Sequence, residues 1–301
     1  MKKIDICIAT YKRPALLAEL LSSLTKQSLE DGLTLRIIII DNDVEKSALQ
    51  IAKNFEHLFP ENLVYFVEKQ KGLSYVRNRA MQYIKSDFFA FLDDDETVEK
   101  FWLKKMYNTM IEKNADVVFG PVISIFPELA PEWARKNPCF NRKRKKTGDL
   151  VKTGATGNVL IRTKSLRFSN TFFDANYALT GGEDTEFFHK LYLLGKKLVW
   201  CNEGIAYEKV HLSRLTQKWI LLRSFRKGQS FGRTFVKRYN FAKKFKWLIV
   251  KLFQILLSFL TLPILRATSY KDYFLLKCKI YEKIGQLSYL AGRFIHYKEY
   301  L

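Results

Sequence analysis

Apolar runs alternate with stretches of helical apolar spacing through the first part of the chain. The run from Leu35 to Ile40 is continuous and rich in β-branched residues, which predicts a parallel strand buried on both faces. Strands that alternate with helices imply right-handed crossovers, so we expect an open α/β sheet that is mostly parallel. The other expected strands are 3–10, 63–67, 89–92 and 117–125, and the expected helices are 16–24, 46–55, 72–83 and 98–113.

Regular patterning is interrupted after residue 125. Three prolines and the basic run from Arg142 to Lys146 predict a surface loop or lid across 126–150. Patterning then resumes, with an expected strand at 157–161, a helix at 185–194 and a short strand at 197–201.

The last third of the chain predicts amphipathic helices. Residues 215–246 are helical in pattern and heavily basic, and they lead into an apolar segment, 247–265, nearly long enough to span a bilayer. A polar stripe at helical spacing favours a helix that lies in a membrane interface or packs on protein. The stripe consists of Lys251, Gln254, Ser258 and Thr261. Pro263 is expected to kink or end this helix, and 270–301 predicts a second amphipathic element.

The excess of basic over acidic residues is concentrated in the C-terminal part of the chain, which bears on what the amphipathic helices bind. The net charge is +21, and residues 201–301 hold 20 of the 51 Lys and Arg but only 5 of the 30 Asp and Glu. Such an excess is typical of proteins that bind nucleic acid or an anionic membrane surface. Because basic and aromatic residues coincide with apolar ones, the membrane surface is favoured. The alternative is a helical subdomain whose apolar side is core.

Composition excludes several other classes of protein. With 48% hydrophobic residues the chain can build a sizeable core, so disorder is not expected. The four cysteines are scattered and predict neither a disulfide framework nor a zinc site, which fits a reducing cytosol. Asp5 interrupts the first apolar run, leaving it too short for a signal peptide.

Four consecutive acids follow the strand expected at 89–92. Asp93, Asp94 and Asp95 repel one another unless a cation neutralises them. Carboxylate oxygens suit Mg²⁺ or Mn²⁺, which keep positions open for substrate phosphates, so the stretch predicts a site for a metal and a diphosphate. The alternative is a solvated acidic turn at the start of the following helix.

Further polar residues fall where parallel strands end. Thr10 and Asp41 end the first two strands, at the edge where open α/β sheets bind ligands. Downstream, the pair Gly181-Gly182 permits close approach of backbone to a ligand, and Glu183 and Asp184 stand at the head of a helix.

In these blocks the sequence resembles family 2 glycosyltransferases with the Rossmann-like glycosyltransferase A fold, of the type that assembles bacterial polysaccharides. The resemblance covers roughly 3–210 and rests on the order of five blocks, at 8–14, 39–42, 71–78, 91–96 and 181–184. It implies a catalytic domain at 1–212, with a nucleotide-binding half at 1–120 and an acceptor half at 121–212. The basic, amphipathic helical region at 213–301 is then expected to associate with a membrane.

The resemblance also implies roles for single residues. Asp184 matches the catalytic base, and Glu183 is expected to orient it or to bind the acceptor. Asp95 matches the metal ligand of the DxD motif, and Asp93 is expected to bind ribose or the metal. Of the three aspartates, Asp94 is expected to take the supporting position. The expected nucleotide or diphosphate contacts are Thr10, Arg13, Asp41, Arg77 and Asn78.

Two departures from the family pattern limit the interpretation. Processive relatives carry a Gln-x-x-Arg-Trp motif and several transmembrane helices, whereas Gln217-Lys-Trp219 matches that motif only in part, which favours single sugar addition. Relatives often have a histidine near the position of Lys209. Here His211 is the nearest histidine and is a candidate metal ligand, although a lone histidine is more often structural.

The sequence therefore predicts a metal-dependent inverting glycosyltransferase. It is expected to move a sugar from a nucleotide-sugar, with UDP as the nucleotide, to a lipid-linked glycan at the cytoplasmic side of the plasma membrane, and to bind no nucleic acid. A sugar-nucleotide nucleotidyltransferase is an alternative, but the chain lacks a glycine-rich phosphate loop after its first strand. A nucleic-acid-binding module that uses the basic C-terminal region is a second alternative.

Overall fold

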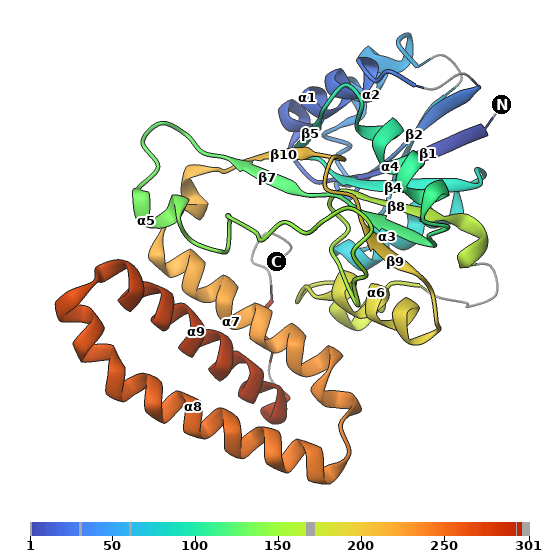
Figure 1. Ribbon diagram of the computed structural model, residues 1–301. Helices are drawn as coiled ribbons and strands as arrows, with labels where there is room; N and C mark the ends of the chain where they lie inside the picture. Colours follow the sequence, from blue (N-terminus) through green and yellow to red (C-terminus); the bar gives the residue numbers. More distant parts are fainter. Residues whose placement is uncertain (1, 30–31, 60–61, 167–171, 293, 297–301) are drawn as a thin grey trace.

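The computed structural model describes residues 2–29, 32–59, 62–166, 172–292 and 294–296 and is built around a seven-stranded sheet (Figure 1). The strand order is β3-β2-β1-β4-β8-β6-β9, and only β8 runs antiparallel to its neighbours. The mostly parallel α/β sheet is thus confirmed. The strands are β1 (Lys2–Thr10), β2 (Leu33–Asp41), β3 (Leu63–Val67), β4 (Phe88–Asp93), β6 (Val117–Phe119), β8 (Val159–Arg162) and β9 (Leu198–Trp200).

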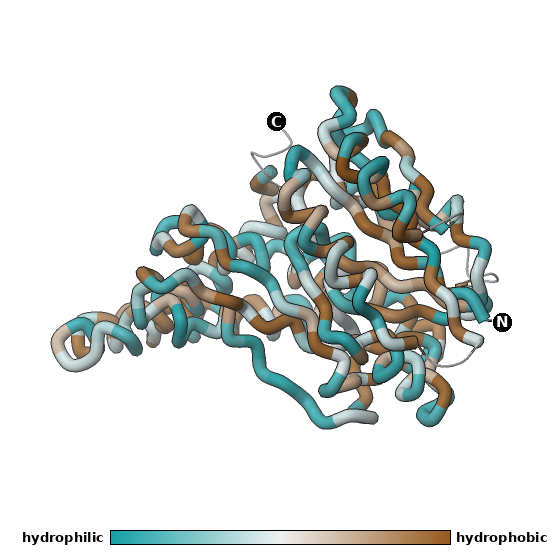
Figure 2. Tube along the Cα trace, turned by 90° about the horizontal axis from the view of Figure 1, so that it is seen from above, coloured by the Kyte–Doolittle hydropathy of each residue, from teal (hydrophilic) through white to brown (hydrophobic). Residues whose placement is uncertain are grey.

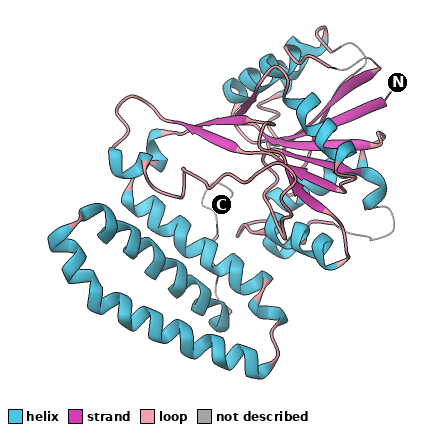
Figure 3. Cartoon of the chain, viewed as in Figure 1, coloured by secondary structure: helices cyan, strands magenta, loops and turns pink. Residues whose placement is uncertain are grey.

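Helices cover both faces of this sheet (Figure 3). Successive side chains of β2 point to opposite faces, so Ile37 and Ile39 pack with α1, α2 and α4, whereas Ile38 and Ile40 pack with α3 and α6. Figure 2 shows hydrophobic and hydrophilic residues alternating along the chain throughout the molecule. The helices here are α1 (Pro14–Thr25), α2 (Leu49–Glu56), α3 (Leu73–Gln82), α4 (Trp102–Glu112), α5 (Glu132–Arg135) and α6 (Glu183–Leu193).

A second sheet of three strands stands beside the first, and it corrects two predicted elements. Its strands are β5 (Glu96–Val98), β10 (Ala206–Lys209) and β7 (Val122–Ile125). The strand predicted at 117–125 is wrong, because Gly120 and Pro121 separate β6 from β7, which lie in different sheets. Pro121 has no N–H to donate to a ladder. The helix predicted from residue 98 begins only at Trp102, because 96–98 pair with β10.

Three C-terminal helices form a separate layer (Figure 1): α7 (Gln217–Thr234), α8 (Phe241–Thr268) and α9 (Tyr270–Ser288). The single helical stretch predicted at 215–246 is interrupted between α7 and α8. Pro263 does not end α8, which continues to Thr268; a proline removes one helical hydrogen bond but leaves those of the flanking turns. Residues 293 and 297–301 of the second amphipathic element lie outside the described residues. Short 3₁₀ helices span Thr163–Ser165, Ala175–Tyr177, Leu212–Arg214, Val236–Arg238 and Tyr289–Ala291.

The polar stripe of α8 faces protein, and its apolar side faces outward. Lys283 of α9 lies with its Nζ 3.3 Å from the Ser258 hydroxyl and 3.4 Å from the Gln254 carbonyl oxygen. Large apolar side chains on the other side are exposed, among them Phe253, Leu256 and Leu260. Among the described residues, α8 is the one helix long and apolar enough to cross a membrane, by length and composition alone.

Candidate active site

The acidic stretch lies where β4 ends and the small sheet begins. Asp94 is buried, and its carboxylate accepts a 2.8 Å hydrogen bond from the Thr10 hydroxyl and a 3.4 Å one from Arg13. Burial raises the pKa of Asp94 to about 7, although Arg13 acts in the opposite direction. Asp94 therefore ties the end of β1 to the end of β4.

Asp93 faces the other way and is the most exposed of the three aspartates, with 45% of its side chain accessible. Its backbone N–H donates to the Glu96 carboxylate at 3.1 Å. Burial, and then the neighbouring Asp93 and Asp95, raise the pKa of Glu96 well above its usual value. Such crowding of carboxylates favours a bound cation.

Gly157 closes one side of this acidic cluster. A Cβ atom there would lie 2.5 Å from Oε1 of Glu96 and 3.1 Å from Oδ2 of Asp93. The segment before β8 therefore passes directly over the acids, and a side chain at this position would displace them.

A buried ion pair joins helix α3 to α6. Arg77 donates to Glu183, and its Nη2 lies 3.6 Å from Oδ1 of Asp93. Both partners of the Arg77–Glu183 pair are buried, and burial raises the pKa of Glu183 to about 7 despite the arginine. Arg77 thus contacts the two acidic groups that the sequence analysis placed in separate roles.

Helix α6 begins at Glu183, two residues earlier than predicted. Gly181 and Gly182 adopt φ values of 77° and 92°, the left-handed region that side chains disfavour, and this turn leads the chain into the helix. Glu183 and Asp184 consequently lie in the first turn, at the positive end of the helix dipole. Asp184 is half-buried and accepts a 2.6 Å hydrogen bond from the Thr185 N–H.

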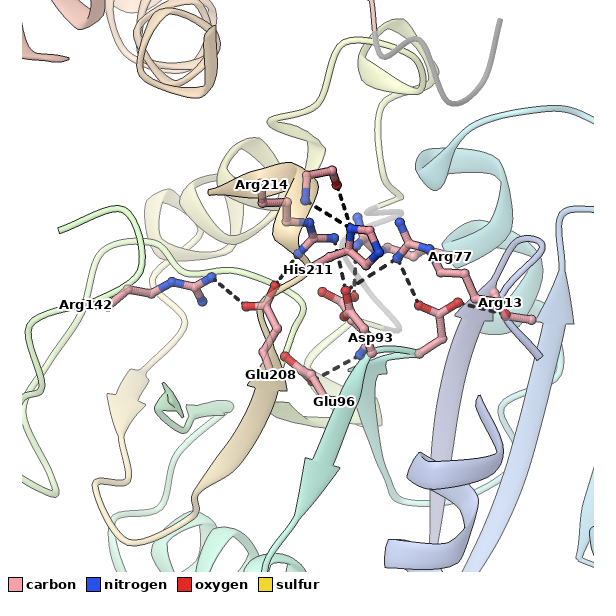
Figure 4. A network of polar contacts seen from close by, with 12 residues as sticks. Arg13, Arg77, Asp93, Glu96, Arg142, Glu208, His211 and Arg214 are labelled. Atoms are coloured by element: carbon pink, nitrogen blue, oxygen red, sulfur yellow. Dashed lines mark hydrogen bonds and ion pairs between the residues drawn. The ribbon is translucent and has the colours of Figure 1, made fainter. Parts of the chain in front are cut away.

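Arg214 covers Asp95 and was not found by sequence reasoning. Its Nη2 lies 3.1 Å from Oδ2 of Asp95, and its Nη1 lies 2.5 Å from Oε1 of Glu208 (Figure 4). Glu208 stands opposite Glu96 in the small sheet and also contacts Arg142 at 3.4 Å. The pairing of Glu208 with Glu96 depends on the register of strands far apart in sequence, so no local pattern could have revealed it.

His211 lies in the same network of residues (Figure 4). Its Nδ1 accepts a hydrogen bond from the Ser213 N–H at 3.2 Å and so caps the short helix Leu212–Arg214. Within the described ranges, no group of three or more His, Cys, Asp or Glu side chains is arranged to hold a metal ion. A metal bound by Asp93, Asp95 and His211 stays a prediction.

Two of the predicted nucleotide contacts, Asp41 and Asn78, have hydrogen-bond partners within the protein. Asp41 is fully buried and accepts hydrogen bonds from the N–H groups of Asp43 and Ala48 and from the Tyr65 hydroxyl. The amide of Asn78 both donates to and accepts from the Phe173 backbone. Contacts of these two side chains with a nucleotide stay a prediction, and within the protein both side chains hold loops at the edge of the sheet.

The fold and the site together define the class of protein. An open α/β sheet with acids at the end of β4, a small second sheet beside them and further acids heading α6 is the architecture of a glycosyltransferase A enzyme. The model of the family "Glycosyl transferase family 2" matches residues 5–169, more than half of the chain. The chain belongs to glycosyl transferase family 2 and is a glycosyltransferase.

Individual relatives agree with this assignment. The succinoglycan biosynthesis protein ExoM of Rhizobium meliloti is 33% identical over 235 residues, covering 78% of this chain and 76% of ExoM. The crystal structure of S. aureus TarS 1-349 in complex with UDP-GlcNAc aligns with a TM-score of 0.57 at 18% identity, over 97% of this chain and 93% of the TarS 1-349 chain. GalNAc-T7 with UDP, GalNAc and Mn²⁺ aligns with a TM-score of 0.58 at 16% identity, over 77% of this chain and 50% of GalNAc-T7. The two structures, at these identities, show the fold alone.

Proposed function

We propose that this glycosyltransferase is a metal-dependent, inverting enzyme that adds single sugars from a UDP-sugar to a lipid-linked glycan in polysaccharide biosynthesis. The observation that carries the proposal is Arg77, which contacts Asp93 at the end of β4 and Glu183 at the head of α6. The buried guanidinium of Arg77 thus links Asp93, expected at the donor, with Glu183, expected at the acceptor.

Asp93, Asp95 and His211 are the proposed metal ligands. The carboxylate oxygens fit Mg²⁺ or Mn²⁺, and the burial and neighbouring carboxylates that raise the pKa of Glu96 fit a cation at this place. No described hydrogen bond occupies Nε2 of His211, since Ser213 uses Nδ1. The metal would supply Lewis-acid stabilisation of the diphosphate leaving group. The Mn²⁺ bound in the GalNAc-T7 structure supports this choice.

The donor is proposed to lie at the carboxyl ends of β1 and β4. Thr10 and Asp94 fix the edge of this site, and Arg13, about one-third exposed, is placed to contact diphosphate oxygens. Guanidinium groups match phosphate geometry well, and Arg77 and Arg214 add two more on the same side. UDP and UDP-GlcNAc in the TarS structures support UDP as the nucleotide.

Asp184 is the proposed catalytic base. A half-buried carboxylate is accessible to an acceptor hydroxyl, and it would remove the hydroxyl proton as the oxygen attacks the anomeric carbon. A single displacement of this kind inverts the configuration. Glu183, held by Arg77, is proposed to orient the start of α6 and to bind the acceptor.

The acceptor is proposed to be lipid-linked and to be met at the cytoplasmic face of the plasma membrane. The exposed apolar side of α8, with Lys243, Lys244 and Lys246 in its first turns, has the composition of a helix that lies in an anionic interface. The relation to a succinoglycan biosynthesis protein supports a role in polysaccharide assembly. The nucleotidyltransferase and nucleic-acid alternatives lack comparable support.

The base assignment is tested by Asp184→Asn. UDP release from a panel of UDP-sugars, with Mn²⁺ or Mg²⁺ and a bacterial lipid-linked glycan extract, is expected to fall by a factor of about 10²–10⁴, the usual contribution of a general base. Metal-dependent UDP binding should be unchanged. The matched control is Asp272→Asn, which alters a first-turn acid of α9 and should retain full turnover. Unchanged turnover in Asp184→Asn would refute the assignment.

A further inference from the structure

A cavity of about 500 Å³ adjoins the proposed site on the side of the basic loop. Its apolar walls include Phe119, Phe140 and Trp200, and its polar rim includes Arg142, Lys143 and Arg144. Ligand sites are commonly apolar pockets with a few convergent polar groups, and this cavity has that composition.

Gly157 lies between the cavity and the acids Glu96 and Asp93. Gly157 lines the cavity, and a Cβ there would meet Glu96 and Asp93. On the rim, Arg142 contacts Glu208, which pairs with the Arg214 that covers Asp95. An occupant of the cavity would therefore lie against the acidic cluster without entering the edge assigned to the nucleotide.

The charged side chains that line the cavity are all basic among the described residues. The described residues that line it include Arg135, Arg142, Lys143 and Arg144 and no aspartate or glutamate. Arg135 donates to three carbonyl oxygens of its own loop, and Arg144 binds Asn202, so these two mainly hold the rim in place. Lys143 is exposed and forms no ion pair within the described residues. Arg142 is paired with Glu208, which does not line the cavity, so the positive charge that favours an anionic occupant is chiefly that of Lys143.

We propose that this cavity binds the acceptor and selects one that carries an anionic group, a phosphate or a carboxylate, at Arg142 and Lys143. The sugar ring of the acceptor would pack against the apolar wall formed by Phe119, Phe140 and Trp200. The inference rests on the proposed function, because it assigns the acceptor to the side of the acids away from the nucleotide.

The test uses the full-length protein with UDP and Mg²⁺ present in excess, so that anions cannot bind at the donor site. Titration calorimetry measures binding of three probes: glucose 1-phosphate, p-nitrophenyl β-glucuronide and p-nitrophenyl β-glucoside. The two charged probes separate phosphate from carboxylate as the source of the anion. At least one of them is expected to bind about tenfold more tightly than the neutral glucoside.

Lys143→Glu is expected to weaken binding of the preferred anionic probe about tenfold and to leave binding of the neutral glucoside unchanged. Lys145→Glu is the matched control, since it makes the same charge change in the same loop at a residue that does not line the cavity. Equal binding of charged and neutral probes, no binding of any probe, or equal effects of the two variants would overturn the proposal. Slow hydrolysis of a UDP-sugar by the same variants reports separately on the donor site, so a failure here is distinguishable from a failure of the proposed function.

Discussion

Adjacent aspartates in this site have opposite surroundings. Asp94 is buried and hydrogen-bonded by Thr10, whereas nearly half of the Asp93 side chain is exposed. The difference follows from the end of β4, where successive side chains still point to opposite sides as the chain turns. The residue pattern identified the acidic cluster, and the turn assigned each acid its environment.

Gly157→Ala is expected to weaken metal-dependent UDP binding about tenfold, because the added methyl group would displace the Glu96 and Asp93 carboxylates. Binding is measured by calorimetry with and without Mn²⁺. Ala155→Ser is the control on the same segment, since Ala155 is exposed and a serine there should leave UDP binding unchanged. Equal UDP binding by the two variants would show that Gly157 has no role in shaping the acidic cluster.

Helices α7 and α9 pack more closely than side chains normally permit. A Cβ on Gly228 would lie 2.0 Å from the Glu282 carbonyl oxygen, and one on Gly285 would lie 2.0 Å from that of Phe225. Glycine at these two positions lets backbone meet backbone. This contact fixes α9, and α9 in turn supports α8.

Gly285→Ala is expected to lower the free energy of unfolding. Alanine gains about 1 kcal/mol of helix propensity, but the rigid backbone of Phe225 cannot yield, and overpacking costs about 1–3 kcal/mol. We therefore expect a net loss of up to about 2 kcal/mol in urea denaturation. Lys271→Ala, at an exposed position of the same helix, should change stability by less than about 0.5 kcal/mol. A gain in stability for Gly285→Ala would contradict the close packing.

At the scale of the molecule, α8 presents an apolar surface on the layer of helices that stands apart from the central sheet (Figure 1). Leu256 and Leu260 are 60% and 65% exposed, and most of their neighbours on this side of α8 are exposed apolar residues too. A contiguous apolar surface of this kind commonly marks a contact with a partner or a membrane. In the proposed membrane contact, the basic residues at the start of α8 would meet lipid headgroups while the leucines enter the apolar layer.

Leu256→Asp combined with Leu260→Asp is expected to reduce binding to vesicles containing anionic lipid at least about tenfold, because two charges would replace two apolar contacts. Cosedimentation measures the bound fraction. Leu129→Asp is the control, since Leu129 is 87% exposed but lies in the loop after β7. Undiminished binding by the double variant would mean that α8 is not the membrane contact.

The sequence by itself determined the elements whose signal is local. The β-branched run before Asp41 predicted a buried strand, and the acids after β4 and in the first turn of α6 could be recognised from their neighbours alone. These features sufficed for the fold class and for the family.

Tertiary structure alone decided which groups meet. Glu208 faces Glu96 because β10 pairs with β5, and Arg214 reaches Asp95 because the segment after β10 passes over the acids. Only the structure revealed that Asp41 is bound by the Tyr65 hydroxyl and by two backbone N–H groups. The polar stripe of α8 was evident in the sequence, but only its packing on Lys283 revealed that the apolar side is the one left exposed. Strand register and packing bring together residues far apart in the chain, and such contacts cannot be predicted from a local sequence pattern.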